Sequence, residues 1–315
     1  MKRVCFILLF VFSFYFKVIA QDSLVVVFWN MENFFDHTYE GGGEADKEFS
    51  SGGRRHWTAK RFFAKCDAVA KSFMWMGDRY DRMPDVIGLA EVENKEVLVK
   101  LLKYTILRKY DYKIIHYDSG DRRGIDVALL YRESVMSPVC ITLKTPHYGG
   151  KKLSTRDILH SRMRLPDGRN IDFIVNHHPS KFGGESVSEG RRNAAMTALK
   201  ELCDSIGNVN IVAMGDFNDS PEGAAFQLID NCLVNEGMDL HRKGEGTIRY
   251  EGRWELIDMF LTGPGVDAEM EICRMPFHIV RERKHPGEKP FRTYSGPKYI
   301  GGISDHFPIV LKIFY

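Results

Sequence analysis

Apolar residues along this chain follow two patterns, one typical of buried strands and one typical of helices. Residues 23–29 and 85–92 are nearly continuous apolar runs, which predicts strands buried on both faces. Residues 59–75 instead carry apolar side chains every three or four positions, which predicts an amphipathic helix. By the same criteria we expect further helices at 95–107 and 190–206, and further strands at 112–116, 125–131, 139–143, 158–165, 170–175, 209–214, 256–261 and 307–314.

The proportion of strands to helices indicates the architecture. Many strands and few helices, with several expected hairpins, predict an α/β (α+β) fold, a four-layer sandwich of two packed mixed β-sheets flanked by helices. No linker, repeat or low-complexity tract divides residues 21–315, so we expect a single domain there. A hydrophobic share of 44% and a charged share of 27% exclude a disordered chain and a coiled-coil rod.

The first twenty residues have the composition of a secretory signal peptide. Lys2 and Arg3 precede a short apolar run, and the small residue that ends this segment predicts cleavage after Ala20. A membrane anchor is the alternative, but the run is short for a span and Lys17 interrupts it. We therefore expect a signal peptide at 1–20 and export to the periplasm or out of the cell, without a permanent membrane span.

Charge and cysteine content narrow the function only a little. Without its first twenty residues, the chain carries 41 basic and 42 acidic side chains, so no long-range positive field attracts polyanions. If the protein handles nucleic acid, we expect local chemistry rather than a basic face to be responsible. Five widely spaced cysteines remain, without metal-ligand or redox spacing, and they allow at most two disulfides.

Polar side chains follow four of the apolar runs at the point where each run ends. They are Asn30, Glu91, Asp216 with Asn218, and the pair Asp305-His306. Because neighbouring strand ends meet at one rim of a layered fold, we expect these groups to converge on one site. The carboxylates of such a rim repel one another, so a bound cation would stabilise them. Oxygen ligands of this kind favour a hard cation such as Mg²⁺, Mn²⁺ or Ca²⁺ over zinc.

Two histidines and a buried acid are further candidates. His177 and His178 follow the strand predicted at 170–175, and a histidine can hydrogen-bond a phosphoryl oxygen or transfer a proton near neutral pH. His178 precedes a proline, and we assign it to packing. Asp258 lies within an apolar strand, where a buried carboxylate needs a partner. A histidine on the neighbouring terminal strand would serve.

A basic segment before the first predicted helix is a candidate substrate-binding surface. Arg54, Arg55 and Trp57 place cations beside an aromatic ring, a combination that suits a phosphate backbone and a stacked base. A solvated loop that leads into a helix explains the same residues equally well. Arg122-Arg123 and Arg292 are further candidates of this kind.

In these residues and in their order, the chain resembles the endonuclease/exonuclease/phosphatase superfamily, whose fold is deoxyribonuclease I-like. The resemblance covers residues 21–315 and implies a metal-dependent phosphoric ester hydrolase. Its most diagnostic segments are GDFN at 215–218 and SDHFP at 304–308. The others are WNMEN at 29–33, LAEVEN at 89–94, GIDVALLY at 124–131, NHHPSK at 176–181 and WELID at 254–258.

The resemblance implies a site for a metal and a phosphate. Glu91 would be the principal ligand of Mg²⁺, or of Mn²⁺ or Ca²⁺, with Asn30 beside it. Asp216 would touch the metal, and Asp305 would lie next to the metal or orient a histidine. Asn176 would bond the phosphate. A divalent ion would supply locally the positive charge that the near-neutral chain lacks.

The resemblance also implies six catalytic residues: His177, Asp216, Asn218, Asp258, Asp305 and His306. Of these, Asp216 and Asn218 would orient the attacking water. His306 would contact the scissile phosphate and be held by Asp258. His177 would stabilise the developing charge or protonate the leaving oxygen. Which group acts as the base and which as the acid stays open.

Three classes of function follow from this sequence. An exported endonuclease that cleaves DNA or RNA is favoured, with nucleic acid as the partner. The alternative is a phosphodiesterase or phosphatase that acts on a phospholipid, a phosphoinositide or a small molecule at the same site. A non-catalytic binding protein would lack one of the site residues, and none is missing. No obligate protein partner is implied.

Overall fold

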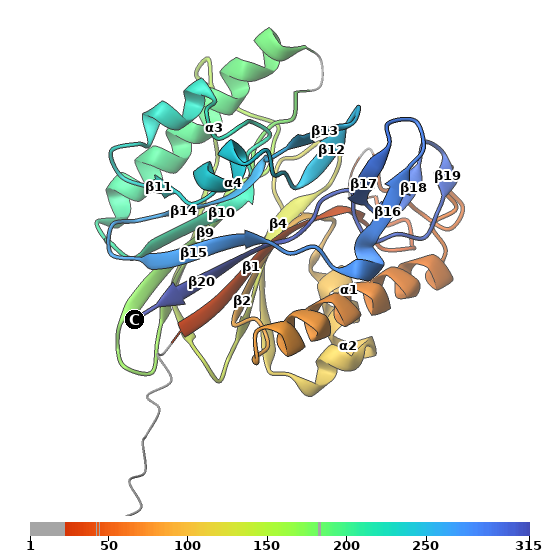
Figure 1. Cartoon of the computed structure of the whole chain (residues 1–315), viewed down its shortest axis with the longest axis horizontal. Coiled ribbons are helices and arrows are strands. Elements are labelled where there is room, and N and C mark those ends of the chain that lie inside the picture. The colour runs from red at the N-terminus through yellow and green to blue at the C-terminus, as the bar shows by residue number, and fades with distance from the viewer. Residues whose placement is uncertain (1–22, 42, 44, 182–183) are drawn as a thin grey trace, which may run out of the picture.

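Figure 1 shows the computed structural model of this chain, which describes residues 23–41, 43, 45–181 and 184–315. The predicted signal peptide lies outside the described residues. Two six-stranded sheets pack face to face, and helices cover both outer faces. The four-layer sandwich expected from the strand pattern is therefore confirmed.

The first sheet is built around β1 (Ser23–Phe34), which runs parallel to β2 (Val86–Val92) and antiparallel to β20 (Ile309–Phe314). Its strand order is β15-β20-β1-β2-β4-β3. The other strands are β3 (Tyr112–His116), β4 (Asp126–Arg132) and β15 (Asp267–Ile272).

The second sheet is built around β10 (Ile211–Asp216), which runs parallel to β9 (Asn170–His177) and antiparallel to β14 (Asp258–Thr262). Its strand order is β11-β14-β10-β9-β8-β5. The other strands are β5 (Ser137–Lys144), β8 (Ile158–Arg164) and β11 (Val234–Asn235).

Helices and short hairpins complete the fold. The α-helices are α1 (Ala59–Arg79), α2 (Lys95–Tyr104), α3 (Glu185–Ile206) and α4 (Met238–Arg242). The 3₁₀ helices are η1 (Ile106–Lys109), η2 (Ala224–Leu228) and η3 (Pro276–His278). The hairpins pair β6 (His147–Tyr148) with β7 (Lys151–Lys152), β12 (Ile248–Tyr250) with β13 (Arg253–Glu255), β16 (Ile279–Glu282) with β17 (Gly287–Pro290), and β18 (Tyr294–Ser295) with β19 (Lys298–Tyr299).

Alternation along β1 explains why the core has layers. Val27 and Trp29 point to one side, where they pack with Phe73 of α1. Val26 and Phe28 point to the other side and join the side chains between the two sheets. A third cluster lies between the second sheet and α3. A strand buried on both faces needs the continuous apolar sequence that residues 23–29 have.

The structure differs from the predicted elements where a capping residue ends a helix early or where a strand is largely polar. The helix expected at 95–107 ends at Tyr104, because Thr105 adopts an extended conformation and its hydroxyl caps η1. The strand β15 alternates acidic and apolar residues at a sheet edge, so it lacks the apolar run that marks the buried strands. The short hairpins escaped prediction for the same reason.

Both parallel pairs of strands deliver side chains to one rim. Asn30 of β1 lies beside Ala90 of β2, and Asp216 of β10 lies beside His177 of β9. Beyond Asn30 the pairing of β1 with β2 shifts register, and Glu32 and Glu91 take positive φ values of 47° and 60°. Such conformations are costly outside glycine and gather at functional sites.

Two features bear on the expected location and on the thiols. Among the described residues, no helix combines the length and the apolar composition that crossing a bilayer requires. The five cysteines of the described part of the chain are all free thiols, and three of them are buried. No disulfide therefore contributes to this part of the fold.

The close contact between β9 and β10 gives a test of the packing. An added Cβ at Gly215 would lie 2.5 Å from the carbonyl oxygen of Asn176. We expect Gly215→Ala to lower the free energy of unfolding by about 1–3 kcal/mol, the usual cost of overpacking, in urea unfolding followed by circular dichroism. Gly120→Ala is the control, since no atom lies within 4 Å of its added Cβ. Equal stability of the two variants would contradict the contact.

Candidate functional site

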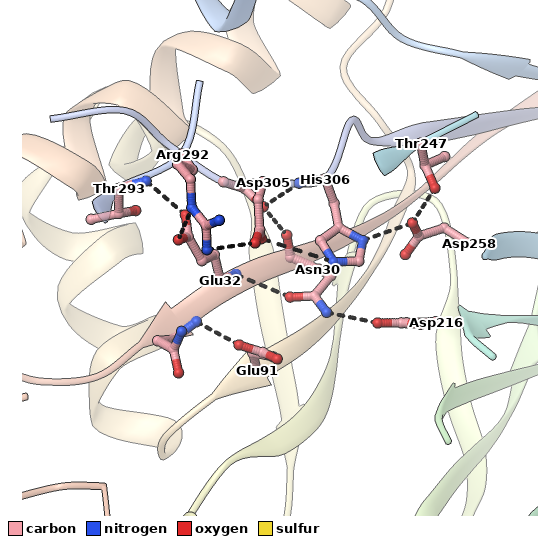
Figure 2. Close-up of polar contacts among 12 residues, drawn as sticks. Asn30, Glu32, Glu91, Asp216, Thr247, Asp258, Arg292, Thr293, Asp305 and His306 are labelled. Atoms are coloured by element: carbon pink, nitrogen blue, oxygen red, sulfur yellow. Dashed lines mark hydrogen bonds and ion pairs between the residues drawn. The ribbon is translucent and has the colours of Figure 1, made fainter. Parts of the chain in front are cut away.

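Two polar contacts join the two sheets at the rim (Figure 2). Asn30 donates from Nδ2 to Oδ2 of Asp216 over 2.9 Å. His306, which precedes β20, contacts Oδ2 of Asp258 through Nδ1 at 2.8 Å. Since β1 and β20 belong to one sheet and β10 and β14 to the other, the candidate site lies on the seam between the sheets.

The His306–Asp258 pair is buried and braced. Thr247 donates a hydrogen bond to the same carboxylate oxygen that contacts His306, and Ser304 accepts one from the backbone N–H of His306 over 3.1 Å. Burial alone would lower the pKa of His306, but the neighbouring carboxylates, Asp258 first among them, raise it well above its ordinary value. The structure thus gives the buried Asp258 the histidine partner that it requires, and favours a charged ring that donates from Nε2.

Asp216 connects this pair to the other candidates. Its Oδ1 accepts a hydrogen bond of 2.9 Å from the backbone N–H of Asn218, and its Oδ2 lies 3.7 Å from Nε2 of His177. Burial and the nearby carboxylate of Asp258 raise the pKa of Asp216 to about 7. Asp216, Asp258 and His306 each place one ligating atom within 4.8 Å of the others.

Glu91 lies at the end of β2 in a cationic setting. Its carboxylate accepts a hydrogen bond of 2.7 Å from the backbone N–H of Asn33 and contacts the guanidinium of Arg123 at 3.3 Å. Burial would raise the pKa of Glu91, but Arg123 and the Asn33 N–H outweigh it and hold the pKa below its ordinary value. Glu91 is therefore an ionised carboxylate at the rim.

A second ion-pair network lies on the other side of Asn30 (Figure 2). Arg292 contacts Glu32 at 3.2 Å and Asp305 at 3.0 Å, and the backbone N–H of Thr293 donates to Glu32 over 2.6 Å. Burial and Asp305 raise the pKa of Glu32 to about 7. Beneath the network the buried Lys65 donates to the backbone carbonyl of Glu32 over 2.7 Å. These contacts fix the turn that carries Asn30.

The two histidines after β9 differ in their surroundings. His177 is 5% exposed, and burial followed by the charges of Arg156 and Arg123 lowers its pKa well below the ordinary value. His178 packs edge-on against Phe217, as expected for a packing residue. Its carbonyl oxygen accepts hydrogen bonds from Arg156 over 2.7 Å and from Asn218 over 3.0 Å.

Asn176 lies at the end of β9, one residue before His177. Its side chain is fully buried, and its Nδ2 donates to the carbonyl oxygen of Met214 over 3.3 Å. Its Oδ1 has no hydrogen-bond partner among the described residues. Asn30 and Asp216 are buried to a similar degree, so burial does not set Asn176 apart, and its contact with the phosphate stays a prediction.

The basic segment before α1 does not have the predicted form. Trp57 is fully buried and donates from Nε1 to the carbonyl oxygen of Phe35 over 2.8 Å, so its ring cannot stack on a base. Arg54 and Arg55 pair with Glu48 at 3.1 Å and 2.7 Å rather than with a residue of the rim. The alternative of a loop that leads into a helix describes this segment better, because the aromatic ring is needed in the core.

Several charged residues of the rim were missed or undervalued from sequence. Arg123 and Arg292 entered only as minor candidates, and Glu32, Lys65 and Arg156 did not enter as site residues. Glu32 lies within the WNMEN segment, but nothing in its spacing shows that it turns toward Arg292. Only the folded chain brings these five residues to the rim.

The donor set at the rim fits a hard divalent cation. Glu91, Asp216 and Asp305 offer carboxylate oxygens, and Asn30 offers an amide oxygen. Oxygen donors of this kind suit Mg²⁺, Mn²⁺ or Ca²⁺. The pKa of Glu91 is held low, so its carboxylate is ready to bind a cation. The cluster of Asp216 with Asp258 and His306 shares only Asp216 with this set, and its His306 is already paired with Asp258.

Fold and site together define a phosphoric ester hydrolase built on a layered sandwich. The model of the endonuclease/exonuclease/phosphatase family matches residues 25–314, and the chain belongs to this family. The family depends on divalent metal, which agrees with the acidic rim. No curated protein matches the chain.

Solved structures with the same fold cover nearly the whole chain. An endonuclease/exonuclease/phosphatase family protein from Bacteroides thetaiotaomicron is 17% identical with a TM-score of 0.61, and covers 94% of this chain and 98% of its own. The mannosyl-6-phosphatase of the same organism is 15% identical with a TM-score of 0.59, and covers 93% and 100%. D. rerio TDP2 complexed with single strand DNA product is 13% identical with a TM-score of 0.55, and covers 93% and 99%. At these identities the comparison shows the fold.

The buried His–Asp pair gives a test with an internal control. We expect Asp258→Asn to lower kcat for phosphodiester hydrolysis by roughly 10²–10⁴-fold, because His306 loses the charge that orients it and keeps it protonated. Asp172→Asn is the matched control, since Asp172 pairs with His160 at 2.7 Å within the second sheet. Both variants should lose stability, but only Asp258→Asn should lose turnover. An equal loss of kcat in both would remove Asp258 from the site.

Proposed function

We propose that this chain is an exported, divalent-metal-dependent nuclease that cleaves internal phosphodiester bonds of DNA or RNA by attack of water on phosphorus. The observation that carries the proposal is the seam between the sheets. There a buried His–Asp pair and a carboxylate cluster are ringed by Arg123, Arg156 and Arg292. A phosphodiester anion needs such donors on its oxygens and a local positive charge.

Metal binding is assigned to Glu91, Asn30, Asp216 and Asp305. A divalent ion held by these oxygens would neutralise the phosphate and lower the pKa of a bound water, and Mg²⁺ is the ion proposed. Arg123 then occupies a place beside Glu91 from which its guanidinium can turn to a phosphoryl oxygen, since its side chain is 42% exposed.

His306 binds the scissile phosphate in this proposal. Its Nδ1 is held by Asp258, so Nε2 is left to donate to a phosphoryl oxygen. Asp258 acts through His306 by fixing the orientation and the charge of the ring. Thr247 in turn fixes Asp258.

Water is oriented by Asp216 and Asn218. These side chains are held by Asn30 and by the carbonyl oxygen of His178, which leaves little rotational freedom to lose on binding. His177 is the second histidine. Its low pKa makes the ring neutral at neutral pH, so it would stabilise the leaving oxygen by donating a hydrogen bond from its one N–H. To protonate that oxygen, the ring would first have to take up a proton, which the lowered pKa disfavours.

The similar structures include enzymes named for substrates of two kinds, and the experiment below tests both kinds on this chain. The D. rerio protein holds single strand DNA product, whereas the Bacteroides enzyme is a mannosyl-6-phosphatase. Nucleic acid is favoured here, because export makes external DNA or RNA accessible and because arginines lie on both sides of the carboxylates.

A supercoiled plasmid tests the proposed activity. Residues 21–315 should nick it with Mg²⁺ and should not do so with EDTA. We expect Glu91→Gln to abolish the metal-dependent activity with its fold intact, and Asp216→Ala/His306→Ala to abolish nicking. Circular dichroism checks the fold of each variant. Full activity of Glu91→Gln would overturn the site, and a folded wild type that hydrolyses only lipid or sugar phosphates would replace the nuclease by a phosphatase.

Export is tested separately from activity. When the full chain is expressed in a Gram-negative host, we expect it outside the cytoplasm with Gln21 as its first residue. N-terminal sequencing and mass spectrometry of the periplasmic and culture fractions measure this. Replacing Lys2 and Arg3 with Glu removes the positive region and should retain the precursor. An uncleaved chain in the cytoplasm would contradict export and leave the nuclease proposal intact.

A further inference from the structure

Two cavities near the rim are lined by cations and by no carboxylate. The first, which we call the hairpin cavity, measures about 640 Å³ and lies by the β6–β7 hairpin. The second, which we call the C-terminal cavity, measures about 540 Å³ and lies by the β16–β17 and β18–β19 hairpins. The cations of the hairpin cavity are Arg122, Lys151, Lys152, Arg156 and Arg191. Those of the C-terminal cavity are Arg281, Arg283, Lys289, Arg292 and Lys298.

Each cavity shares an arginine with the catalytic rim. Arg156 lines the hairpin cavity and donates to the carbonyl oxygen of His178, next to His177. Arg292 lines the C-terminal cavity and contacts Asp305 at 3.0 Å. Each cavity is therefore connected to the proposed catalytic residues through one arginine.

A line of contacts runs from one cavity to the other through the site. Arg292 contacts Glu32, whose backbone N–H donates to Oδ1 of Asn30. Asn30 donates to Asp216, whose carbonyl oxygen accepts from the backbone N–H of His178. His178 in turn binds Arg156. Figure 2 shows this order from Arg292 through Asn30 to Asp216.

Most of these cations have no acidic partner of their own. Lys151, Lys152 and Arg191 of the hairpin cavity make no ion pair within the described part of the chain, and the same is true of Arg281, Arg283 and Lys298 of the C-terminal cavity. Three others are paired: Lys289 with Glu282, Arg156 with Asp121 at 3.1 Å, and Arg292 with Asp305. In a chain whose basic and acidic residues nearly balance, unpaired cations gathered in two cavities are a local departure from the average.

The β6–β7 hairpin is anchored where it carries its lysines. Tyr148 lies against α3 at Gly190, where an added Cβ would come within 2.7 Å of the tyrosine hydroxyl. The absence of a side chain at Gly190 thus lets the hairpin pack on the helix. This packing holds Lys151 and Lys152 at the cavity.

We propose that the two cavities bind phosphates on either side of the scissile phosphate, so that one polynucleotide strand crosses the whole site and is cut at an internal bond. This inference rests on the proposed nuclease function. A terminal phosphate or a small phosphoester would leave at least one cavity without a charge to bind. Phosphate contacts in both cavities would hold the strand in register across the site and so position an internal bond for cleavage.

Binding without turnover gives the first test. The probe is a fluorescent 20-nucleotide single-stranded DNA, and anisotropy in EDTA is followed over a series of salt concentrations. Lys151→Glu/Lys152→Glu and Arg283→Glu/Lys298→Glu should each weaken binding by roughly tenfold or more at low salt, and each should reduce the salt slope by about 0.7 for every phosphate that the variant no longer neutralises. Lys103→Glu/Lys109→Glu carries the same charge change on α2 and η1, and it should bind like the wild type.

Hydrolysis separates this inference from the function on which it rests. All three variants should hydrolyse bis(p-nitrophenyl) phosphate with Mg²⁺ like the wild type, and the wild type should cut the labelled oligonucleotide internally. Loss of DNA binding in both cavity variants supports the inference. Loss in only one of them, or in neither, overturns it even when plasmid nicking is intact. A wild type that hydrolyses the small diester but neither binds nor cuts DNA or RNA overturns the nuclease proposal as well.

Discussion

The hydrogen bond from Asn30 to Asp216 joins the two sheets, and the candidate site depends on it. Together with the His306–Asp258 pair, it brings residues of both sheets into one site. The distance between these side chains is set by how closely the sheets pack, because each lies in or directly before a strand that packs in the core. A densely packed interior is hardly compressible, so the distance between the sheets is nearly fixed. Packing between the sheets therefore fixes the chemistry at the rim.

Charge balance is the second constraint. A cluster of buried carboxylates is unstable unless cations or hydrogen bonds offset it. Here Arg123, Arg292 and Lys65 perform this task beside Glu91, Asp305 and Glu32. The result is a polar centre with an ionised Glu91, a charged His306 and a neutral His177, while the pKa values of Asp216 and Glu32 are raised to about 7. The chain around this centre is close to neutral overall. This combination gives a phosphate a set of donors without a strong long-range field.

The cationic cavities refine what overall charge suggested. A near-neutral composition argues against a basic face, since the formal net charge of the chain is only +2. Yet the hairpin and C-terminal cavities concentrate unpaired cations beside the rim. Most of these residues come from short hairpins with polar sequences, which no hydrophobic pattern marks. Net charge sums over the whole chain and does not show where the cations gather. Because salt screens charges over about 10 Å, the cations close to a site decide which anion binds there.

The sequence by itself determined the layered fold, the main strands and helices, and the polar residues that follow the apolar runs. It could do so because apolar runs and the polar residues after them are local properties of the chain. The GDFN and SDHFP segments and their order also indicated the family, which the match over residues 25–314 confirmed. Tertiary structure decided which charges meet. It buried Trp57 and brought Arg156 and Arg292 to the rim. Side-chain partners far apart in sequence depend on sheet packing, and spacing along the chain carries no record of it.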